Sequence, residues 1–355
     1  IRHGACVTFT DLKSESQLMP SLRRLVGDVK LRLGEHNDSD IADSEVIVFN
    51  PDIPIRSPHV ALAKLLNKRI ENEATLFYKL CNIPIAAVTG TRGKTTTSAW
   101  LAHFLNARFN TIPVGNSPAN PLMKTLQRIE GISLTSNRRR NVKPFVVVNE
   151  LPSYHLEYFS FITKRPDIAV ITNIFPDHLD RHPSLEDYVD TKANIFLRQT
   201  ESQHIVLNYG NRWTEYLLRK PRRSRAWVFS KSVLPPDYAG VFYNDRSVYF
   251  QDPTTRTYGR VLSIDDFSRT RGEHNLENLL GSSLAAYLAG TAWREIQRRI
   301  DTLPQIAFRQ TVAFQNDQLT IINDNAATSP EGSIAAIRRF GGSNCILITG
   351  GTDRN

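Results

Sequence analysis

The chain has 355 residues, 41% of them hydrophobic, and a formal net charge of +9. Its mean hydropathy is −0.32, and no apolar run approaches the roughly 18 residues of a membrane span, which excludes a membrane-embedded protein. No secretory signal is visible, and the three cysteines, Cys6, Cys81 and Cys345, lie far apart. A disulfide scaffold and a cysteine metal cluster are therefore excluded, and we expect a cytoplasmic protein of two or three domains.

The first region, residues 1–82, reads as a small α/β domain. We predict strands in "CVTFTD" (6–11) and "SEVIVFNPDIP" (44–54), and an amphipathic helix in "PHVALAKLLNKRI" (58–70). A strand that ends in Asp before a loop is typical of the second strand of a nucleotide-binding fold. The first strand would then lie upstream. Since "CILITGGTDRN" (345–355) also stops just after a predicted strand and glycine turn, we expect a fragment open at both ends.

A phosphate-binding loop is predicted in "IPIAAVTGTRGKTTTSAWLAHFL" (83–105). An apolar strand, a glycine turn and an amphipathic helix follow one another in the order that the motif G-x-x-x-x-G-K-[ST] requires, although Val88 occupies the place of the first glycine. Backbone N–H groups of the turn would face the phosphates, Lys94 would add a positive charge, and the Thr95 hydroxyl could ligate Mg²⁺. The simpler alternative is a glycine turn capped by threonines.

Polar residues follow two further apolar strands. Glu150 ends the strand in "PFVVVNELPSYHLEYF" (144–159), and "DIAVITNIFPDHLDRHPSLEDYVDTKANIF" (167–196) places Asp177, His178 and Asp180 in a loop before a helix with Lys192. Strand ends of this kind line the ligand crevice of an α/β fold, so we expect Glu150 and His178 near the phosphate loop. The alternatives are a helix cap for Glu150, a local turn for His178 and a solvated lysine at 192.

Two basic runs, "NRRRNVK" (137–143) and "RKPRRSR" (219–225), carry much of the positive charge. Such runs are usually solvated loops, and no aromatic interleaving or nucleic-acid motif accompanies them. We therefore expect no nucleic-acid partner, since a polyanionic nucleotide substrate accounts for a basic protein equally well.

These motifs resemble, in order and over nearly the whole chain, those of the Mur ligases, the ATP-dependent amino-acid-adding ligases of peptidoglycan synthesis. The matching stretches are "TGTRGKTT" (89–96), "VGNSPANPL" (114–122), "NELPSYHLE" (149–157), "TNIFPDHLDRH…DYVDTKANIF" (172–196), "VLNYGN" (206–211), "RGEHNLENLLGSSLAA" (271–286), "FRQ" (308–310) and "INDNAATSPE" (322–331). The family's short phosphate loop lacks the first standard glycine, as here.

The resemblance implies a three-domain α/β architecture. Residues 1–82 would bind the UDP-sugar, residues 83–302 would form the ATP-binding ligase domain with a mostly parallel sheet, and residues 303–355 would begin a Rossmann-like domain for the amino acid. In the third region, "INDNAATSPE" and "GGTDRN" are similar to family members that add D-glutamate to UDP-N-acetylmuramoyl-L-alanine. Members that add diaminopimelate, lysine or the first alanine carry a D-Y-A-H-x-P stretch instead. Folylpolyglutamate synthases carry a related stretch that also contains His, and this chain has neither.

The resemblance also assigns roles residue by residue. In the ATP site, Asn275 and Asn278 would contact the adenine side, Arg309 the γ-phosphate and Asp324 the ribose. The phosphate loop would contribute Gly90, Thr91, Arg92, Gly93, Lys94, Thr95 and Thr96. Thr95 and Glu150 would hold one Mg²⁺, and His178 with a carbamylated Lys192 a second. The uridine diphosphate end would meet Asp11, Leu12 and Lys13, the muramoyl group Asn116, and the incoming glutamate Thr328 and Arg354.

The implied reaction joins a carboxylate to an amine through an acyl phosphate, with Lys94, Glu150, His178 and Lys192 at the reaction centre. Four residues depart from the usual family pattern, namely Arg92, Pro152, Phe308 and Ala326. They leave open whether D-glutamate or another amino acid, such as L-glutamate, is added. A nucleotide-binding homologue that no longer ligates is the alternative of a different class, and we expect a monomer in either case.

Overall fold

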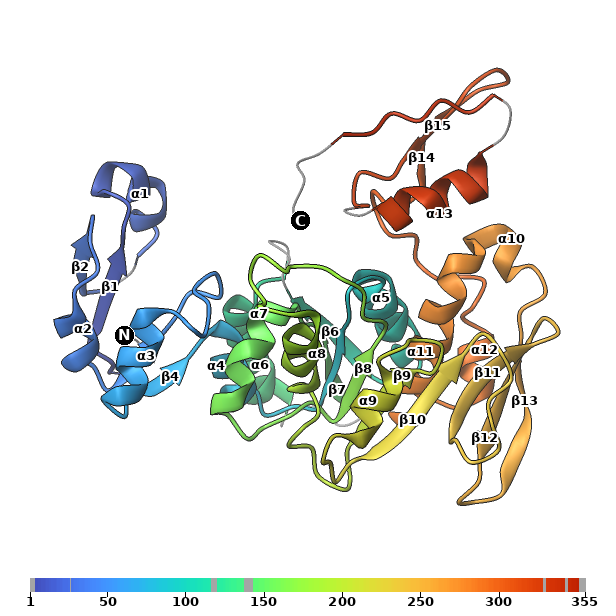
Figure 1. Cartoon of the computed structure of the whole chain (residues 1–355), viewed down its shortest axis with the longest axis horizontal. Helices are drawn as coiled ribbons and strands as arrows, with labels where there is room; N and C mark the ends of the chain where they lie inside the picture. Colours follow the sequence, from blue (N-terminus) through green and yellow to red (C-terminus); the bar gives the residue numbers. More distant parts are fainter. Residues whose placement is uncertain are drawn as a thin grey trace.

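A computed structural model covers the whole chain and describes residues 4–25, 27–115, 120–136, 143–327, 330–341 and 344–350. Its centre is a nine-stranded sheet flanked by helices on both faces (Figure 1). In sheet order the strands are β13 (Thr257–Ser263), β12 (Ser247–Asp252), β11 (Gly240–Asn244), β10 (Arg225–Ser230), β9 (His204–Asn208), β8 (Ile168–Ile171), β5 (Ile85–Thr89), β7 (Phe145–Glu150) and β6 (Asn110–Gly115).

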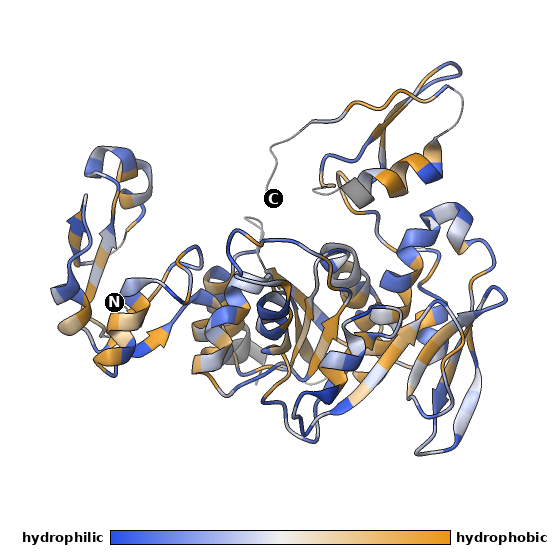
Figure 2. Cartoon of the chain, viewed as in Figure 1, coloured by the Kyte–Doolittle hydropathy of each residue, from blue (hydrophilic) through white to orange (hydrophobic). Residues whose placement is uncertain are grey.

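The seven strands β5 to β11 run parallel to one another. At the edge of the sheet, β12 pairs antiparallel with β11, and β13 pairs antiparallel with β12. The central strand β5 shows why the sheet is covered twice. Its residues Ile85 and Ala87 belong to one buried core, whereas Ala86 and Val88 belong to the other. Successive side chains of a strand point to opposite faces, so a strand that is apolar throughout must be buried on both. Figure 2 shows the resulting concentration of hydrophobic residues along the central strands.

One face of this sheet packs against two long helices, α5 (Lys94–Leu105) and α11 (Leu276–Leu288), with α10 (Phe267–Arg271) and α12 (Trp293–Gln297) beside them. The other face is covered by α4 (Glu73–Leu80), α6 (Leu122–Ser136), α7 (Ser153–Leu156), α8 (Leu185–Ala193) and α9 (Thr214–Arg219). The 3₁₀ helices η1 (Glu157–Phe161) and η2 (Glu273–Asn275) complete the middle region. This three-layer arrangement confirms the predicted α/β fold with a mostly parallel sheet.

The N-terminal unit contains two small parallel pairs, β1 with β2 and β3 with β4. Its elements are β1 (Val7–Asp11), α1 (Glu15–Leu22), β2 (Val29–Leu33), α2 (Asp38–Ala42), β3 (Val46–Val48), α3 (Pro58–Leu65) and β4 (Arg69–Glu71). The two strands predicted in this region are therefore present. At the other end of the chain, β14 (Thr311–Gln315) pairs antiparallel with β15 (Thr320–Asn323) and precedes α13 (Pro330–Phe340). Figure 1 places this C-terminal piece above α10.

Two predicted elements differ from the structure. The helix predicted for 58–70 ends at Leu65, because Asn67 adopts a left-handed φ of 52° and the next residues form β4. Asn tolerates this conformation better than other non-glycine residues, and a helix cannot continue through it. The strand predicted at 345–349 is absent from the described residues 344–350, where Ile346 and Ile348 are 88% and 93% exposed. A strand needs a neighbouring strand to pair with, and an apolar pattern alone does not supply one.

None of the described helices combines the length and the apolar character needed to cross a membrane. The three cysteines are free thiols.

The packing of α5 suggests a stability test. Phe104 of α5 is completely buried in the core between this helix and the sheet, whereas Leu65 of α3 is 78% exposed. Truncating a buried Phe to Ala typically costs about 3–5 kcal/mol. We expect Phe104→Ala to lower the Tm of the main unfolding transition by on the order of 10 °C. The control Leu65→Ala is expected to leave it within about 2 °C. Equal shifts in differential scanning calorimetry would contradict the assigned core.

Candidate active site at the carboxyl edge of the sheet

Two glycines shape the predicted phosphate loop between β5 and α5. Gly93 precedes the helix with a left-handed φ of 78°, and a Cβ there would lie 2.2 Å from Asn278 Oδ1. Gly90 has a φ of 144°, and its Cβ would lie 1.9 Å from Thr172 Oγ1. Any side chain at either position would collide with a neighbour, so the loop has this shape only with glycine. The first N–H groups of α5 consequently remain open to an anion.

The loop is held from behind by the segment that follows β8. The Thr91 N–H donates to Asn173 O over 2.9 Å, and the Arg92 N–H donates to Asn173 Oδ1 over 2.9 Å. The Thr172 hydroxyl donates to Arg92 O over 2.6 Å. These bonds attach the backbone of the loop to the segment that follows β8. They make a preorganised cradle, which loses little freedom when an anion binds.

Lys94, the first residue of α5, folds back over the loop. Its Nζ donates to Gly90 O over 3.0 Å and to Thr91 O over 2.9 Å. Burial lowers the pKa of Lys94, while the charges of Glu150 and Asp177 raise it and that of Arg309 lowers it. The structure therefore brings Glu150 and Arg309 into the electrostatic surroundings of the phosphate-loop lysine, as the sequence predicts for Glu150.

Lys192 of α8 reaches the same carbonyl. Its side chain is almost fully buried, its Nζ donates to Gly90 O over 3.0 Å, and the ring centroid of Tyr188 lies 4.4 Å from Nζ. Burial, reinforced by the positive charge of Lys94, lowers the pKa of Lys192 well below its usual value, against an opposing effect of Asp177. A lysine in such a setting is neutral more readily than a solvated one, and a neutral amine is the form that reacts with electrophiles. The expectation of a merely solvated lysine is thus not met.

Tyr188 is a site residue that the sequence interpretation did not include. Its hydroxyl hydrogen-bonds Thr91 Oγ1 over 3.3 Å, and burial raises its pKa. The side chain thereby joins α8 to the phosphate loop and forms one wall around the Lys192 amine. The spacing of four residues between Tyr188 and Lys192 places both on one face of the helix, and this signal could have identified it.

His178 lies in the loop between β8 and α8, with a left-handed φ of 55°. Its N–H donates to Asp177 Oδ1 over 3.0 Å. Burial lowers the pKa of His178, and the charges of Lys192 and Lys94 lower it further while Asp177 raises it. Glu150 is the last residue of β7 and lies beside Gly115 at the end of β6, where a Cβ would approach Glu150 O to 2.9 Å. The two lysines and His178 thus share one electrostatic environment at the carboxyl edge of the sheet.

The two asparagines of the α11 region lie behind the loop. Asn278 is 8% exposed and its amide donates to Asn275 Oδ1 over 2.8 Å, while its oxygen accepts from the Thr97 hydroxyl over 3.1 Å. Both ends of the Asn278 amide are therefore engaged within the protein, where they join α11 to α5. Thr95 is half-buried and Thr96 is buried in the first turn of α5.

The remaining predicted residues divide between the two ends of the chain. Burial raises the pKa of Asp324, against the opposing effects of its hydrogen bond from Gln310 and of the charge of Arg309. The Asp324 carboxylate accepts that bond from the Gln310 N–H over 3.0 Å. Asp11, Leu12 and Lys13 form the turn after β1, in which the Lys13 N–H donates to Asp11 Oδ1 over 2.9 Å. Three predicted substrate residues, Asn116, Thr328 and Arg354, and most of the basic run 137–143 lie outside the described residues.

The donors available to a metal are limited in number. Among the described residues, no group of three or more His, Cys, Asp or Glu side chains is arranged to hold a metal ion. The predicted magnesium ligands include one carboxylate, from Glu150, one imidazole, from His178, and the hydroxyl of Thr95. Mg²⁺ prefers oxygen ligands and usually keeps several waters. The set fits Mg²⁺ if water or substrate phosphate completes it, and Lys192 joins only if its amine is converted to an anion.

The chain is similar in sequence to a known family and to named enzymes. Residues 88–286 match the family described as Mur ligase middle domain. The chain is 34% identical over 357 residues to the UDP-N-acetylmuramoylalanine--D-glutamate ligase of Roseiflexus sp. (strain RS-1), which covers 99% of this chain and 73% of that protein. The enzyme of the same name from Clostridioides difficile (strain 630) is 33% identical over 355 residues, with 99% and 73% covered.

Solved structures support the fold. The crystal structure of MurF from Acinetobacter baumannii superposes with a TM-score of 0.56 at 15% identity, over 96% of this chain and 70% of that one. MurF ligase from Thermotoga maritima, crystallised in complex with ADP, superposes with a TM-score of 0.51 at 16% identity. The superposition covers 96% of this chain and 73% of that one.

The glycine geometry leads to a binding test. We expect Gly93→Ala to weaken binding of an ATP analogue by at least about tenfold, because it places a Cβ against Asn278 and forces a left-handed alanine, strains worth on the order of 1–3 kcal/mol. The matched control is Gly259→Ala in β13, where a Cβ meets nothing within 4 Å. Isothermal titration calorimetry compares the two. Unchanged affinity in Gly93→Ala would show that the nucleotide does not use this loop.

Proposed function

This chain belongs to the Mur ligase family, and from that membership we propose that it is the ATP-dependent ligase that joins D-glutamate to UDP-N-acetylmuramoyl-L-alanine. The observation that carries the proposal is the identity of 33–34% to two ligases of that name over 99% of this chain. The convergence of Lys94 and Lys192 on Gly90 O supports it independently, since two amines brought together at a phosphate loop suit a reaction between anions.

The reaction has two steps. The carboxylate of the UDP-linked substrate attacks the γ-phosphorus of ATP, so that a P–O bond forms and ADP leaves. The amine of the amino acid then attacks the acyl carbon, the C–O bond to phosphate breaks, and the amine loses a proton. Because little covalent chemistry is asked of the protein, its task is to position the reactants and neutralise their charge. Lys94 would hold the β- and γ-phosphates, Arg309 the γ-phosphate, and Asp324 the ribose.

The remaining ATP contacts follow the same reasoning. Residues 90–96 supply N–H groups and hydroxyls to the phosphates, in a loop whose geometry accepts an anion. Asn275 and Asn278 would meet the adenine side, although the hydrogen bonds of Asn278 to Thr97 and Asn275 also support the loop from behind. We assign both asparagines this double task.

Two magnesium ions fit the same edge of the sheet. Thr95 and Glu150 would hold the first, and His178 with a carbamylated Lys192 the second. Magnesium neutralises the charge of phosphate oxygens and of the developing acyl phosphate when bound. Carbamylation, in which the neutral amine adds to CO₂ and loses a proton, would give a carbamate whose single negative charge is shared by two oxygens beside the ion. The depressed pKa of buried Lys192 favours the neutral amine that this reaction with CO₂ requires.

The substrate end of the proposal rests on position in the sequence. Asp11, Leu12 and Lys13 would contact the uridine diphosphate, Asn116 the muramoyl group, and Thr328 and Arg354 the glutamate. The division into domains at 1–82, 83–302 and 303–355 belongs to the proposal as well, as does a monomeric state. Two alternatives remain, a ligase of this family that adds another amino acid, such as L-glutamate, and a nucleotide-binding homologue without ligase activity.

The decisive experiment measures phosphate release with ATP, Mg²⁺ and UDP-N-acetylmuramoyl-L-alanine while the amino acid is varied. We expect turnover with D-glutamate to exceed that with L-glutamate, L-lysine or L-alanine by at least about 10²-fold. Highest turnover with one of the other three would assign the chain to a different specificity. Phosphate release with none, from a protein that binds ATP, would favour the non-catalytic homologue.

Lys192 provides a sharper chemical test. We expect Lys192→Ala to lower turnover by about 10²-fold or more, and formate or acetate to restore part of it by supplying the missing anion. Methylamine would replace an ordinary ammonium group, and we expect it not to restore the turnover of Lys192→Ala. A second readout is independent of activity: protein equilibrated with ¹³C-labelled CO₂ should give a carbamate carbon resonance that disappears in Lys192→Ala. Rescue by methylamine and not by carboxylate, or an unchanged carbamate resonance, would contradict the carbamate.

A further inference from the structure

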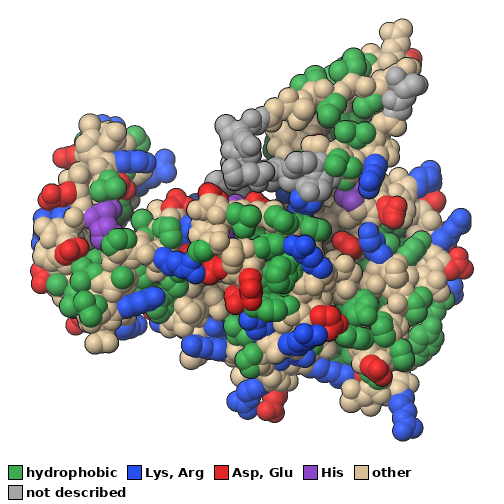
Figure 3. Space-filling view, in the orientation of Figure 1, with side chains coloured by type: hydrophobic (Ala, Val, Ile, Leu, Met, Phe, Trp, Pro, Cys, Tyr) green, Lys and Arg blue, Asp and Glu red, His purple; other side chains and the backbone are tan. Residues whose placement is uncertain are grey.

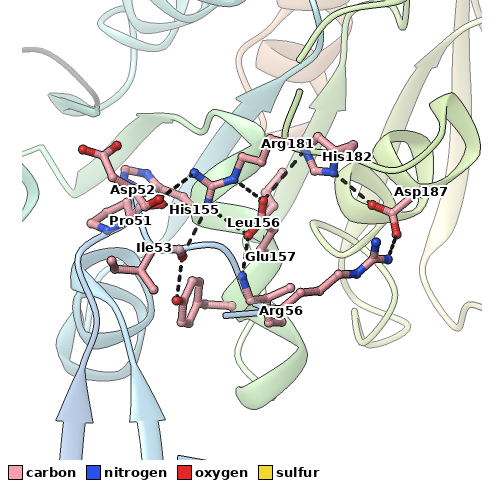
Figure 4. A network of polar contacts seen from close by, with 12 residues as sticks. Pro51, Asp52, Ile53, Arg56, His155, Leu156, Glu157, Arg181, His182 and Asp187 are labelled. Atoms are coloured by element: carbon pink, nitrogen blue, oxygen red, sulfur yellow. Dashed lines mark hydrogen bonds and ion pairs between the residues drawn. The ribbon is translucent and has the colours of Figure 1, made fainter. Parts of the chain in front are cut away.

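The N-terminal unit meets the middle of the molecule at a joint of charged and polar residues, defined as residues 51–56 on one side and Glu157, Arg181, His182 and Asp187 on the other, of which Glu157 and His182 are buried. Figure 4 shows these residues converging from segments more than a hundred positions apart in the sequence. In Figure 3 a notch separates the upper part of the N-terminal unit from the middle of the molecule, and the two are continuous below it. An apolar cluster, in which Phe49 and Val60 pack with Tyr158, also joins the two parts, and the directional bonds of the joint add a constraint on their orientation.

Arg181 bridges the two sides. Its Nε donates to Glu157 Oε1 over 2.5 Å and its Nη2 to Glu157 Oε2 over 2.9 Å, while the same Nη2 donates to Pro51 O over 2.7 Å. Nη2 also lies 3.4 Å from Ile53 O. A guanidinium has donors in a fixed fork, so the carboxylate orients the side chain and the remaining N–H bonds hold the backbone of the N-terminal unit in a set position.

Glu157 makes the reciprocal contact. Its Oε2 accepts from the Ile55 N–H over 3.1 Å, so one carboxylate binds both Arg181 and the segment that Arg181 binds. The residue is 5% exposed. Because a charge-assisted bond in such a place gains from the low local dielectric and an unpaired partner is costly, the arrangement favours one geometry over others.

A second connection runs beside the first. Arg56 Nη2 donates to Asp187 Oδ1 over 2.5 Å, and His182 Nδ1 lies 3.1 Å from Asp187 Oδ2. The Tyr158 hydroxyl donates to Ile53 O over 2.8 Å. Segment 51–56 is thus attached to the middle region at both of its ends and in between.

Arg181 belongs to the turn of residues 178–182, which begins at His178. The Arg181 N–H donates to His178 O over 3.1 Å and the His182 N–H donates to the same oxygen over 3.0 Å. His178 therefore lies one turn away from the arginine, in a strained left-handed conformation that depends on its surroundings. Because both N–H groups bond the backbone of His178, a shift of Arg181 would displace that residue, whose electrostatic surroundings include Lys94 and Lys192.

We propose that Arg181, oriented by Glu157, is a positioning residue that sets the distance between the N-terminal unit and the loop of His178. The inference rests on the proposed function, in which one substrate is held at its UDP end by the N-terminal unit and reacts at the phosphate loop. Such a substrate reaches the reacting geometry only if the two binding places keep a defined separation, and a displacement of about 1 Å can cost on the order of 10²-fold in rate.

The kinetic test compares Arg181→Ala and Glu157→Gln with the control Arg223→Ala. Arg223 pairs with Glu201 on the surface, where both side chains are more than 70% exposed, and such a pair contributes little. We expect kcat/KM for the UDP-linked substrate to fall by about 10²-fold in Arg181→Ala. The KM for ATP should stay within about twofold, since the phosphate loop is braced by Thr172 and Asn173 and not by the joint. Should Arg181→Ala fail to fold, Arg181→Lys retains the charge without the fork and takes its place.

A distance measurement tests the joint without activity. Spin labels at Ser39→Cys in the N-terminal unit and Ser202→Cys in the middle region, both exposed positions, are introduced after the exposed Cys6 and Cys345 are replaced by serine. We expect one narrow distance distribution in the parent protein and in Arg223→Ala, and a broad one in Arg181→Ala.

An unchanged distribution in Arg181→Ala would overturn the proposal, and so would a broad distribution accompanied by unchanged kcat/KM. Loss of ATP affinity equal to the loss of kcat/KM would overturn it as well, because it would indicate general damage. If the parent protein has no ligase activity, the proposed function fails, while the distance distributions still decide whether Arg181 sets the joint.

Discussion

The carbonyl oxygen of Gly90 accepts hydrogen bonds from two lysine amines, those of half-buried Lys94 and buried Lys192, and the rest of the site depends on this convergence. It is possible because Gly90 occupies a backbone conformation that leaves no space for a Cβ beside Thr172. Two positive charges brought together in a poorly solvated place repel one another, and each amine loses hydration. The arrangement is costly in isolation, which indicates a site built to receive anions and metal ions.

The parallel sheet explains how residues from distant parts of the chain reach that point. β5, β7 and β8 are neighbours and run in the same direction, so their carboxyl ends open at one edge. The phosphate loop follows β5, Glu150 ends β7, and the His178 loop follows β8. Helix α8 then returns along the sheet, with Lys192 and Tyr188 on its inner face. The edge of the sheet collects the groups, and the helix closes the space around them.

The joint at Arg181 joins this edge to the N-terminal unit. The charges of Arg181 and Glu157 are paired with each other, and the remaining N–H groups of Arg181 donate to backbone carbonyls. Apolar surfaces slide more readily than a fork of directional hydrogen bonds does. A joint of this kind therefore suits a place where angle and distance matter more than adhesion, between a unit that would hold one end of a long substrate and a site that acts on the other.

The sequence by itself determined the local features: the strand, glycine turn and helix of the phosphate loop, the polar residues at the ends of β7 and β8, and the mostly parallel α/β fold. These follow from short-range rules, the alternation of apolar residues and the glycines that a tight turn requires. The end of α3 at Leu65 and the missing strand at 345–349 were predicted wrongly, because the first depends on the backbone angle of Asn67 and the second on a pairing partner. Only the tertiary structure decided the burial of Lys192, its contact with Tyr188 and the bond from Arg181 to Pro51. Burial and contacts between residues 130 positions apart arise when the chain packs, and no local pattern encodes them.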